Sequence, residues 1–197
     1  MAQGADEFYF RDGRVYVPFH TARLAAGPFL SLSPDWVEQY LELPPELHHG
    51  VLDRYVGGVG MPRTRLAAAQ VHGDSMICRD VLHGDIVLFQ RVENDYSGNG
   101  KIVVIEKMGE EEGLGAWALK KLVVERRRSS RQSEYEDEID WDDPVVVLRS
   151  YNPHVSPARL DPDGRYRVHG IFLRSLRGQD VSFVDANAIR RFVSGEP

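Results

Sequence analysis

The chain has 197 residues, of which 42% are hydrophobic and 27% charged, a composition that is ordinary for a globular protein and excludes fibrous and wholly disordered chains. Its apolar runs, such as Ile102 to Ile105, are far shorter than the roughly 20 residues that a membrane-spanning helix needs. The 30 acidic and 24 basic side chains give a net charge of -6, which argues against direct DNA binding by this chain alone.

The N-terminal third of the chain predicts short elements rather than a folded domain. The dipeptide Asp12-Gly13 is typical of a turn between two short strands within Tyr9 to Val17. Ser33-Pro34-Asp35, followed by apolar residues at helical spacing, predicts a short amphipathic helix that ends at Pro44-Pro45. The glycine-rich stretch that follows is interpreted as a loop.

From Leu66 onward, many short strands separated by turns predict a mostly β domain. The strands are expected at Ile86–Phe89, Lys101–Lys107, Ala116–Glu125, Val145–Arg149 and Tyr166–Leu173, with the second and third forming a hairpin. We therefore divide the chain into an N-terminal arm (1–27), a linker with the short helix (28–65), the β domain (66–176) and a tail (177–197) with a possible helix from near Asp185.

One segment inside the β domain stands out by its charge. Arg126 to Asp143 carries four arginines and seven acidic residues with few apolar ones, and so accounts for -3 of the net charge. A segment of this composition can bury little surface, which predicts a mobile surface loop.

Ser75 is the main candidate for chemistry. It lies on a glycine-containing turn directly before the apolar Met76, ten residues ahead of Asp85, where Gly84-Asp85 opens a strand. A serine hydroxyl is a poor nucleophile until a neighbouring base takes its proton. We interpret Met76 as a core residue and Asp85 as a structural turn residue, which leaves the base to be found elsewhere.

Three bases can be considered: His72, Asp74 and a lysine. The two near neighbours are disfavoured, because residues so close in a tight or extended segment seldom aim their side chains at one another. A lysine acts as a base only if burial lowers its pKa by roughly three units. Lys120 and Lys121 lie in an apolar strand that supplies such burial, and strand alternation leaves the choice between them even.

Five motifs in chain order resemble the Ser-Lys peptidase domain of the LexA/UmuD family. They are Gly73-Asp74-Ser75-Met76, Gly84-Asp85 at the start of a strand, Leu119-Lys120-Lys121-Leu122, Leu148-Arg149-Ser150-Tyr151-Asn152-Pro153, and the late strand Tyr166-Arg167-Val168-His169-Gly170-Ile171. The resemblance covers about Leu66 to Leu176 and implies a curved, mostly β fold.

The resemblance also implies an active site and a substrate. Ser75 would be the nucleophile and Lys120 the general base, with backbone N–H groups of Asp74 and Ser75 as the oxyanion hole. The family cuts its own chain upstream of the serine, and here the matching bond lies between Ala26 and Gly27. Small residues suit a narrow cleft, and glycine permits the bend that brings the carbonyl to the serine.

The biological role follows from the length of chain before that bond. Twenty-six residues are too few for a helix-turn-helix domain, so a UmuD-like role in an SOS response to DNA damage is expected over a repressor role. The partners implied are a second copy of the chain through the late strand near Tyr166 to Leu173, a RecA filament, and a DNA polymerase or repressor target. The alternatives are a dimerising regulatory module with a vestigial dyad, a peptidase that cuts another protein, and the C-terminal peptidase domain of a longer repressor-like protein.

The remaining features predict the compartment and the absence of a cofactor. A single cysteine, Cys78, cannot form an internal disulfide, and the first residues lack the pattern of a secretion signal. His48 and His49 are adjacent and lack further ligands at metal-binding spacing, so we interpret them as surface histidines. We expect a cytoplasmic protein without metal or cofactor.

Overall fold

The structure is a computed structural model that describes residues 9–25, 30–32, 37–48, 66–72, 76, 81–92, 99–107, 115–125, 145–154, 156–159, 166–177 and 181–194. Within these residues the chain is mostly β, as predicted, and its twelve strands form one mixed sheet. The strands are β1 (Tyr9–Arg11), β2 (Arg14–Ala25), β3 (Leu30–Leu32), β4 (Val37–Leu43), β5 (Leu66–His72), β6 (Ile86–Arg91), β7 (Ile102–Lys107), β8 (Gly115–Glu125), β9 (Val145–Arg149), β10 (Ala158–Arg159), β11 (Tyr166–Ser175) and β12 (Ser182–Asp185). Two helical elements accompany them in the described part of the chain, the 3-10 turn η1 (Pro45–Leu47) and the helix α2 (Ala186–Ser194).

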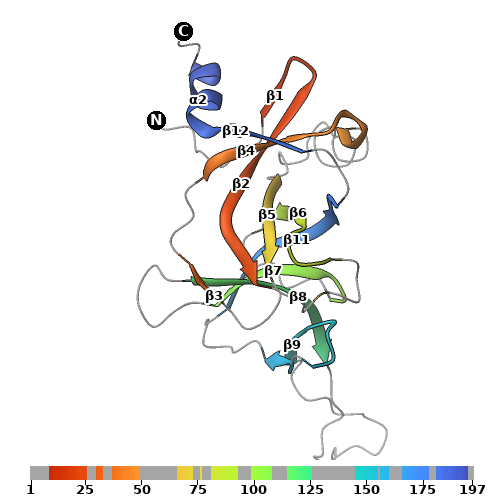
Figure 1. The fold of residues 1–197 in the computed structure, drawn as a ribbon. Coiled ribbons are helices and arrows are strands. Elements are labelled where there is room, and N and C mark those ends of the chain that lie inside the picture. Colours follow the sequence, from red (N-terminus) through yellow and green to blue (C-terminus); the bar gives the residue numbers. More distant parts are fainter. Residues whose placement is uncertain are drawn as a thin grey trace, which may run out of the picture.

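The order of the strands explains the shape of the sheet. They are hydrogen-bonded in the order β10-β9-β8-β7-β11-β6-β5-β2-β4-β12, with β1 on β2 and β3 on β8. A bridge between Ala25 of β2 and Ala118 of β8 joins two distant places in this order, so the sheet curls strongly without closing into a barrel. In Figure 1, β2 runs from the end that carries β4, β12 and α2 toward β8, and β9 lies at the opposite end.

Strand β2 is a central strand, whereas its residues were predicted to belong to an arm outside the β domain. The predicted turn is present, with Asp12 at φ 50° and Gly13 at φ 75°, values that suit a tight β-hairpin turn. Beyond this turn, β2 pairs with β4 on one side and β5 on the other. Val15 and Val17 are fully buried. The sequence did not indicate this role because the pairing partners lie far along the chain.

The predicted helix over 33–43 is wrong where the structure describes it, because residues 37–43 form β4. Tyr40 faces α2, while Leu41 and Leu43 pack against β2 on the other face of the sheet. A strand that is covered on both faces has apolar residues on both faces. Over so short a segment, the spacing of these residues in the sequence cannot be distinguished from that of a helix.

Several other predicted elements are confirmed. Strands β7 and β8 form the expected hairpin, with Ile102 opposite Lys121 and Lys107 opposite Ala116. Strands β6, β9 and β11 occur at the expected places. The loop predicted over residues 126–143 lies outside the described residues.

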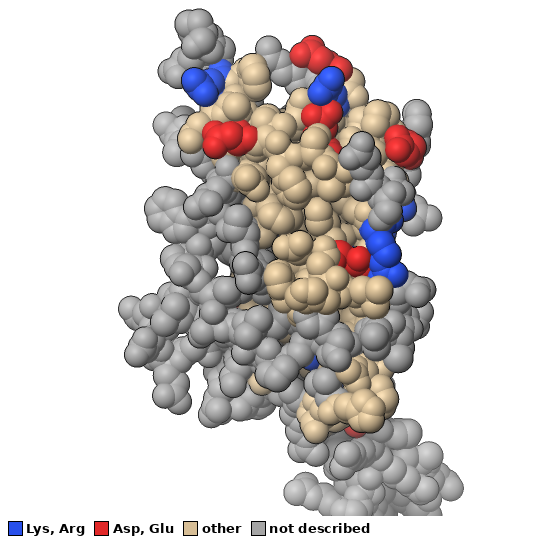
Figure 2. All heavy atoms as spheres, in the orientation of Figure 1, with Lys and Arg blue, Asp and Glu red and all other residues tan. Residues whose placement is uncertain are grey.

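The tail ends in the expected helix. The Asp185 side chain accepts hydrogen bonds from the backbone N–H groups of Asn187 at 2.8 Å and Ala188 at 3.3 Å, which caps the N-terminus of α2. Ile189 of α2 packs on Tyr40. Across the described residues, no helix has the length and the apolar character to cross a membrane. On the face of the molecule shown in Figure 2, the charged side chains lie mainly near the edges of the face.

Strand β11 lies between β6 and β7 and contains a position that only glycine fits. A Cβ atom on Gly170 would lie 2.3 Å from Cδ2 of Phe89, a buried side chain on β6. The register of β11 shifts between Val168 and Gly170 and again between Phe172 and Arg174, which bends the strand. Strand β11 pairs with β7 over residues 166–171 and with β6 over residues 170–175, so each of its edges is paired over part of its length.

We expect Gly170→Ala to lower the free energy of unfolding by about 1–3 kcal/mol, because the added methyl group overpacks the contact with Phe89. Urea denaturation measures the change, and Ser182→Ala on the exposed face of β12 is the control. Phe89→Leu should recover part of the loss in the double variant. A loss below about 0.5 kcal/mol, the range of ordinary surface substitutions, would contradict this packing.

Candidate active site around Lys120

Strand β8 carries the two candidate lysines on opposite faces. Lys120 alternates with Ala118 and Leu122, both fully buried, and is itself only 5% exposed. Opposite it on β7 lies Val103, which is also fully buried. This apolar setting penalises a charged amine, so burial lowers the pKa of Lys120 from its usual 10.5 to about 8.

Lys121 has a different environment. Its side chain is half-buried, and its Nζ lies 5.5 Å from the centre of the Tyr151 ring, within the range of a cation-π contact. The structure thus distinguishes the two lysines, which strand alternation had left equal: Lys120 is the buried one with a lowered pKa.

Ser150 contacts the buried lysine directly. Lys120 Nζ donates a hydrogen bond to Ser150 Oγ at 2.7 Å. Ser150 follows the last residue of β9, and the antiparallel register that pairs Arg149 with Lys121 brings it to the level of Lys120. The sequence offered a signal for this residue, because Ser150 lies within the Leu148 to Pro153 motif, but no role had been assigned to it.

The C-terminal end of β2 pairs with β5, the strand that leads to Ser75, and with β8, the strand that carries Lys120. Ala25, the last residue of β2, pairs with His72, the last residue of β5, and also with Ala118 on β8. Leu30 of β3 then pairs with Trp117, again on β8. The chain on both sides of the predicted cleavage bond is therefore held against the strand that carries Lys120.

The residues that flank Ser75 are also described. His72 ends β5, three residues before the serine, and three residues reach at most about 11 Å. Met76 follows the serine and is fully buried in one cluster with Leu119, the neighbour of Lys120. Ser75 lies outside the described residues, and so do Asp74, Ala26, Gly27 and Cys78.

The turn before β6 has the structural role predicted for it. Gly84 has φ 87°, a conformation that favours glycine, and its N–H donates to the carbonyl of Val71 at 2.8 Å. Asp85 is buried and accepts hydrogen bonds from the N–H of Leu82 at 2.8 Å and from Arg177 at 2.6–3.1 Å. Burial alone would raise the pKa of Asp85, but these hydrogen bonds and the Arg177 charge outweigh it and hold the pKa below its usual value.

We expect Asp85→Asn to lower the free energy of unfolding by about 2 kcal/mol at pH 7, because it removes the negative charge beside Arg177 and replaces one of the two acceptor oxygens by an NH2 donor. The lowered pKa means that Asp85 contributes this stability above its usual value of 3.8 and loses it as the pH falls through the folded-state value. Urea denaturation at pH 7 and at pH 3 measures both effects. The control is Glu42→Gln in the exposed Arg14 pair, with an expected change below about 1 kcal/mol; equal losses in the two variants would contradict this role.

One histidine prediction is wrong. His48 is buried, and its Nε2 lies 2.9 Å from the carbonyl oxygen of Leu43 at the end of β4, so it belongs to the core and not to the surface. Its partner His49 lies outside the described residues. Among the residues that the structure describes, no group of three or more His, Cys, Asp or Glu side chains is placed to hold a metal ion.

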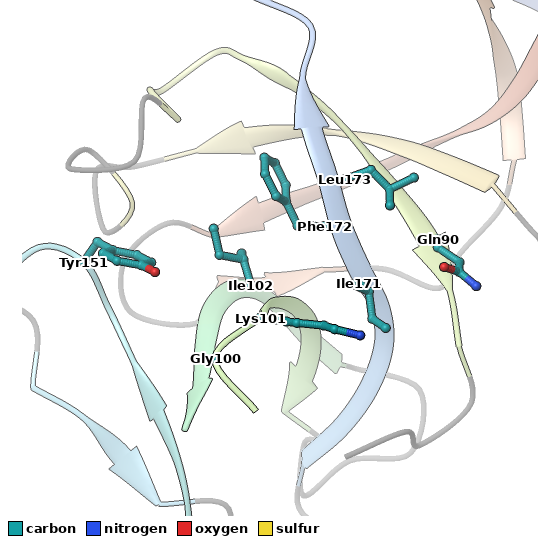
Figure 3. Close-up of a pocket in the computed structure, with 8 residues that line it drawn as sticks. All are labelled: Gln90, Gly100, Lys101, Ile102, Tyr151, Ile171, Phe172 and Leu173. Carbon is teal, nitrogen blue, oxygen red and sulfur yellow. The ribbon is translucent and has the colours of Figure 1, made fainter. Parts of the chain in front are cut away.

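A pocket of about 410 Å³ lies on the Lys121 side of β8. Its walls come from β6, the turn before β7, the residue after Ser150, and β11: Gln90, Gly100, Lys101, Ile102, Tyr151, Ile171, Phe172 and Leu173. In Figure 3 the Lys101 side chain extends toward Ile171 on β11. Lys120 does not line this pocket, and nothing in the sequence indicated a pocket here.

The geometry of the described site is therefore a buried lysine with a hydroxyl acceptor, on a strand that also pairs with both sides of the predicted bond. No protein-family model matches this chain, and no curated protein sequence matches it.

Proposed function

We propose that this chain is a serine peptidase of the LexA/UmuD type, with Ser75 and Lys120 as its dyad, that cuts its own chain between Ala26 and Gly27. The observation that carries the proposal is the pairing of Ala25. This residue, one before the proposed bond, pairs with the strand that leads to Ser75 and with the strand that carries Lys120.

The burial of Lys120 supports its role as the base. With a pKa of about 8, roughly a tenth of the amine is neutral at pH 7, far more than for a lysine at 10.5. A general base works best when its pKa is near the operating pH. The hydrogen bond to Ser150 holds the amine in one place.

The proposed reaction balances without a cofactor. Neutral Lys120 takes the proton of the Ser75 hydroxyl while the oxygen attacks the carbonyl carbon of Ala26, and backbone N–H groups receive the oxyanion. The protonated lysine then gives its proton to the nitrogen of Gly27 as the C–N bond breaks. Water, activated by the same amine, hydrolyses the Ala26 ester and frees Ser75.

The arrangement favours cleavage within one chain. Strand β2, which leads to the proposed bond, is hydrogen-bonded to β5 and β8 of the same molecule, and this supports attack on the bond by the dyad of its own chain. We further propose, from the resemblance alone, a UmuD-like role in a cytoplasmic response to DNA damage, with a second copy, a RecA filament and a polymerase as partners.

Three single substitutions test the dyad. Ser75→Ala and Lys120→Ala should abolish self-cleavage, whereas Lys121→Ala should cleave at the wild-type rate, because its side chain lies on the other face of β8. The measurement is the loss of full-length chain on denaturing gels during incubation at pH 9, with circular dichroism to verify folding. Cleavage by Lys120→Ala at the wild-type rate would overturn the proposal.

A further inference from the structure

The hydrogen bond between Lys120 and Ser150 gives the proposed dyad a third member. We propose that Ser150 is a positioning residue: its hydroxyl accepts one N–H of the Lys120 amine and thereby fixes the direction of the lone pair that takes the proton of Ser75. This role rests on the proposed function. The observation that carries it is the 2.7 Å distance between Ser150 Oγ and the Nζ of Lys120, whose side chain is buried.

The backbone delivers Ser150 to this place. Strand β9 pairs with β8 from Val145 opposite Glu125 to Arg149 opposite Lys121, and Ser150 is the next residue. An ion pair joins Arg149, at the Lys121 end of this pairing, to Glu125, at its other end. Because five consecutive residue pairs fix the register, the position of Ser150 does not depend on its own side chain.

The chain after Ser150 is held as well. The ring of Tyr151 lies under the Lys121 amine at 5.5 Å. One residue further, the Asn152 side chain accepts a hydrogen bond from the N–H of His154 at 3.0 Å, which stabilises the turn through Pro153. The pairing of β9 before Ser150 and these contacts after it restrict the directions that the Ser150 hydroxyl can take.

The chemical nature of the acceptor suits a base that must be neutral. A carboxylate in this position would favour the protonated amine and raise the pKa of Lys120 again. An apolar side chain would leave a buried N–H without this acceptor, which costs stability and frees the amine to rotate. A hydroxyl accepts one hydrogen bond and adds no charge, so it orients the amine and leaves the lowered pKa of about 8 in place.

A purely structural hydroxyl would satisfy the buried amine and nothing more, and it makes a different prediction. Its loss would lower stability without a specific effect on the cleavage rate of the molecules that remain folded. Positioning instead predicts a loss of rate in fully folded protein, because a misplaced group of this kind costs up to about a hundredfold in rate.

The first experiment measures self-cleavage of the full chain from pH 6 to pH 10. Ser150→Ala should cleave about tenfold to a hundredfold more slowly at every pH while its circular dichroism spectrum stays that of the wild type, and Ser150→Thr, which keeps the hydroxyl, should recover most of the rate. Ser182→Ala, an exposed serine on β12, is the matched control. A wild-type rate in folded Ser150→Ala would overturn the role of Ser150 and leave the peptidase in place.

The second experiment does not depend on cleavage. The chain has only four lysines, so ¹³Cε-lysine NMR gives four signals, which Lys→Arg variants assign. In the Ser75→Ala background, Ser150→Asp should raise the titration midpoint of Lys120 by at least one pH unit, and Ser182→Asp should not. An unchanged midpoint in Ser150→Asp would show that the two side chains are not in contact. A raised midpoint in a chain whose wild type never cleaves would support the contact and refute the peptidase.

Discussion

A cut between Ala26 and Gly27 is expected to leave the two fragments bound to each other. Fragment 1–26 contains the whole of β2, whose Val15, Val17 and Phe19 are buried in one cluster with side chains of β4 and β5. Each such side chain contributes about 1.5–3 kcal/mol on burial. In the described sheet, β2 is also the strand through which β4, β12 and α2 join the rest. The processed protein would therefore be a two-chain protein and not a core that has lost an arm.

This prediction is tested without self-cleavage. A recognition sequence for a sequence-specific protease is inserted between Ala26 and Gly27 in the Ser75→Ala variant, the chain is cut, and the product is passed through size-exclusion chromatography before mass spectrometry. Both fragments should elute together from native buffer and separate in concentrated urea. Elution of fragment 1–26 by itself, with the remainder still folded, would contradict the structural role of β2.

Replacing Lys120 by methionine is expected to abolish self-cleavage and, at neutral pH, to stabilise the fold. An absent general base costs about 10²–10⁴-fold in rate. The pKa of Lys120 falls from 10.5 to about 8 on folding, so the unfolded chain binds more protons between these values and stability rises with pH across that window. Below pH 8 the amine is charged in both states, and burying this charge lowers the free energy of unfolding by about 3 kcal/mol.

Methionine removes that penalty together with one hydrogen bond of about 1 kcal/mol, so Lys120→Met should gain about 2 kcal/mol at pH 7. The gain should shrink as the pH rises from 8 toward 10.5, where the wild-type amine is neutral in both states. Urea denaturation at pH 7 and at pH 10.5 provides the measurement and its internal control. A variant that is less stable than the wild type at pH 7 would mean that Lys120 is not desolvated in the folded chain.

Local patterns in the sequence predicted the elements that local chemistry determines. Asp12-Gly13 and Gly84 adopt positive φ angles that suit few residues other than glycine and aspartate, and the turns at both places follow from that. The hairpin of β7 and β8 pairs strands that are neighbours along the chain. By contrast, β2 is paired with β4 and β5, and β4 is paired with β12 and covered by α2, and no local pattern reveals contacts between elements so far apart in the sequence.

The candidate site was likewise predicted only where local sequence motifs determine it. Motif resemblance selected Ser75 and Lys120, but alternation alone could not separate Lys120 from Lys121, because both neighbour apolar side chains along β8. The three-dimensional structure separates them, because Lys120 is buried with its amine on Ser150, whereas Lys121 on the other face of β8 lies beside Tyr151. Ser150 was missed for the same reason, since it is thirty residues from Lys120 in sequence and adjacent to it only across the sheet.

The most direct test of the proposed peptidase is the intact mass of the purified chain during incubation from pH 6 to pH 10. Two new masses should appear, those of residues 1–26 and 27–197. Their rate of formation should rise about tenfold per pH unit up to the Lys120 pKa of about 8 and level off above it, as the neutral fraction of the amine does. A chain that stays full length at pH 9 while its circular dichroism spectrum is that of the folded protein, or one that is cut at another bond, would contradict the proposal.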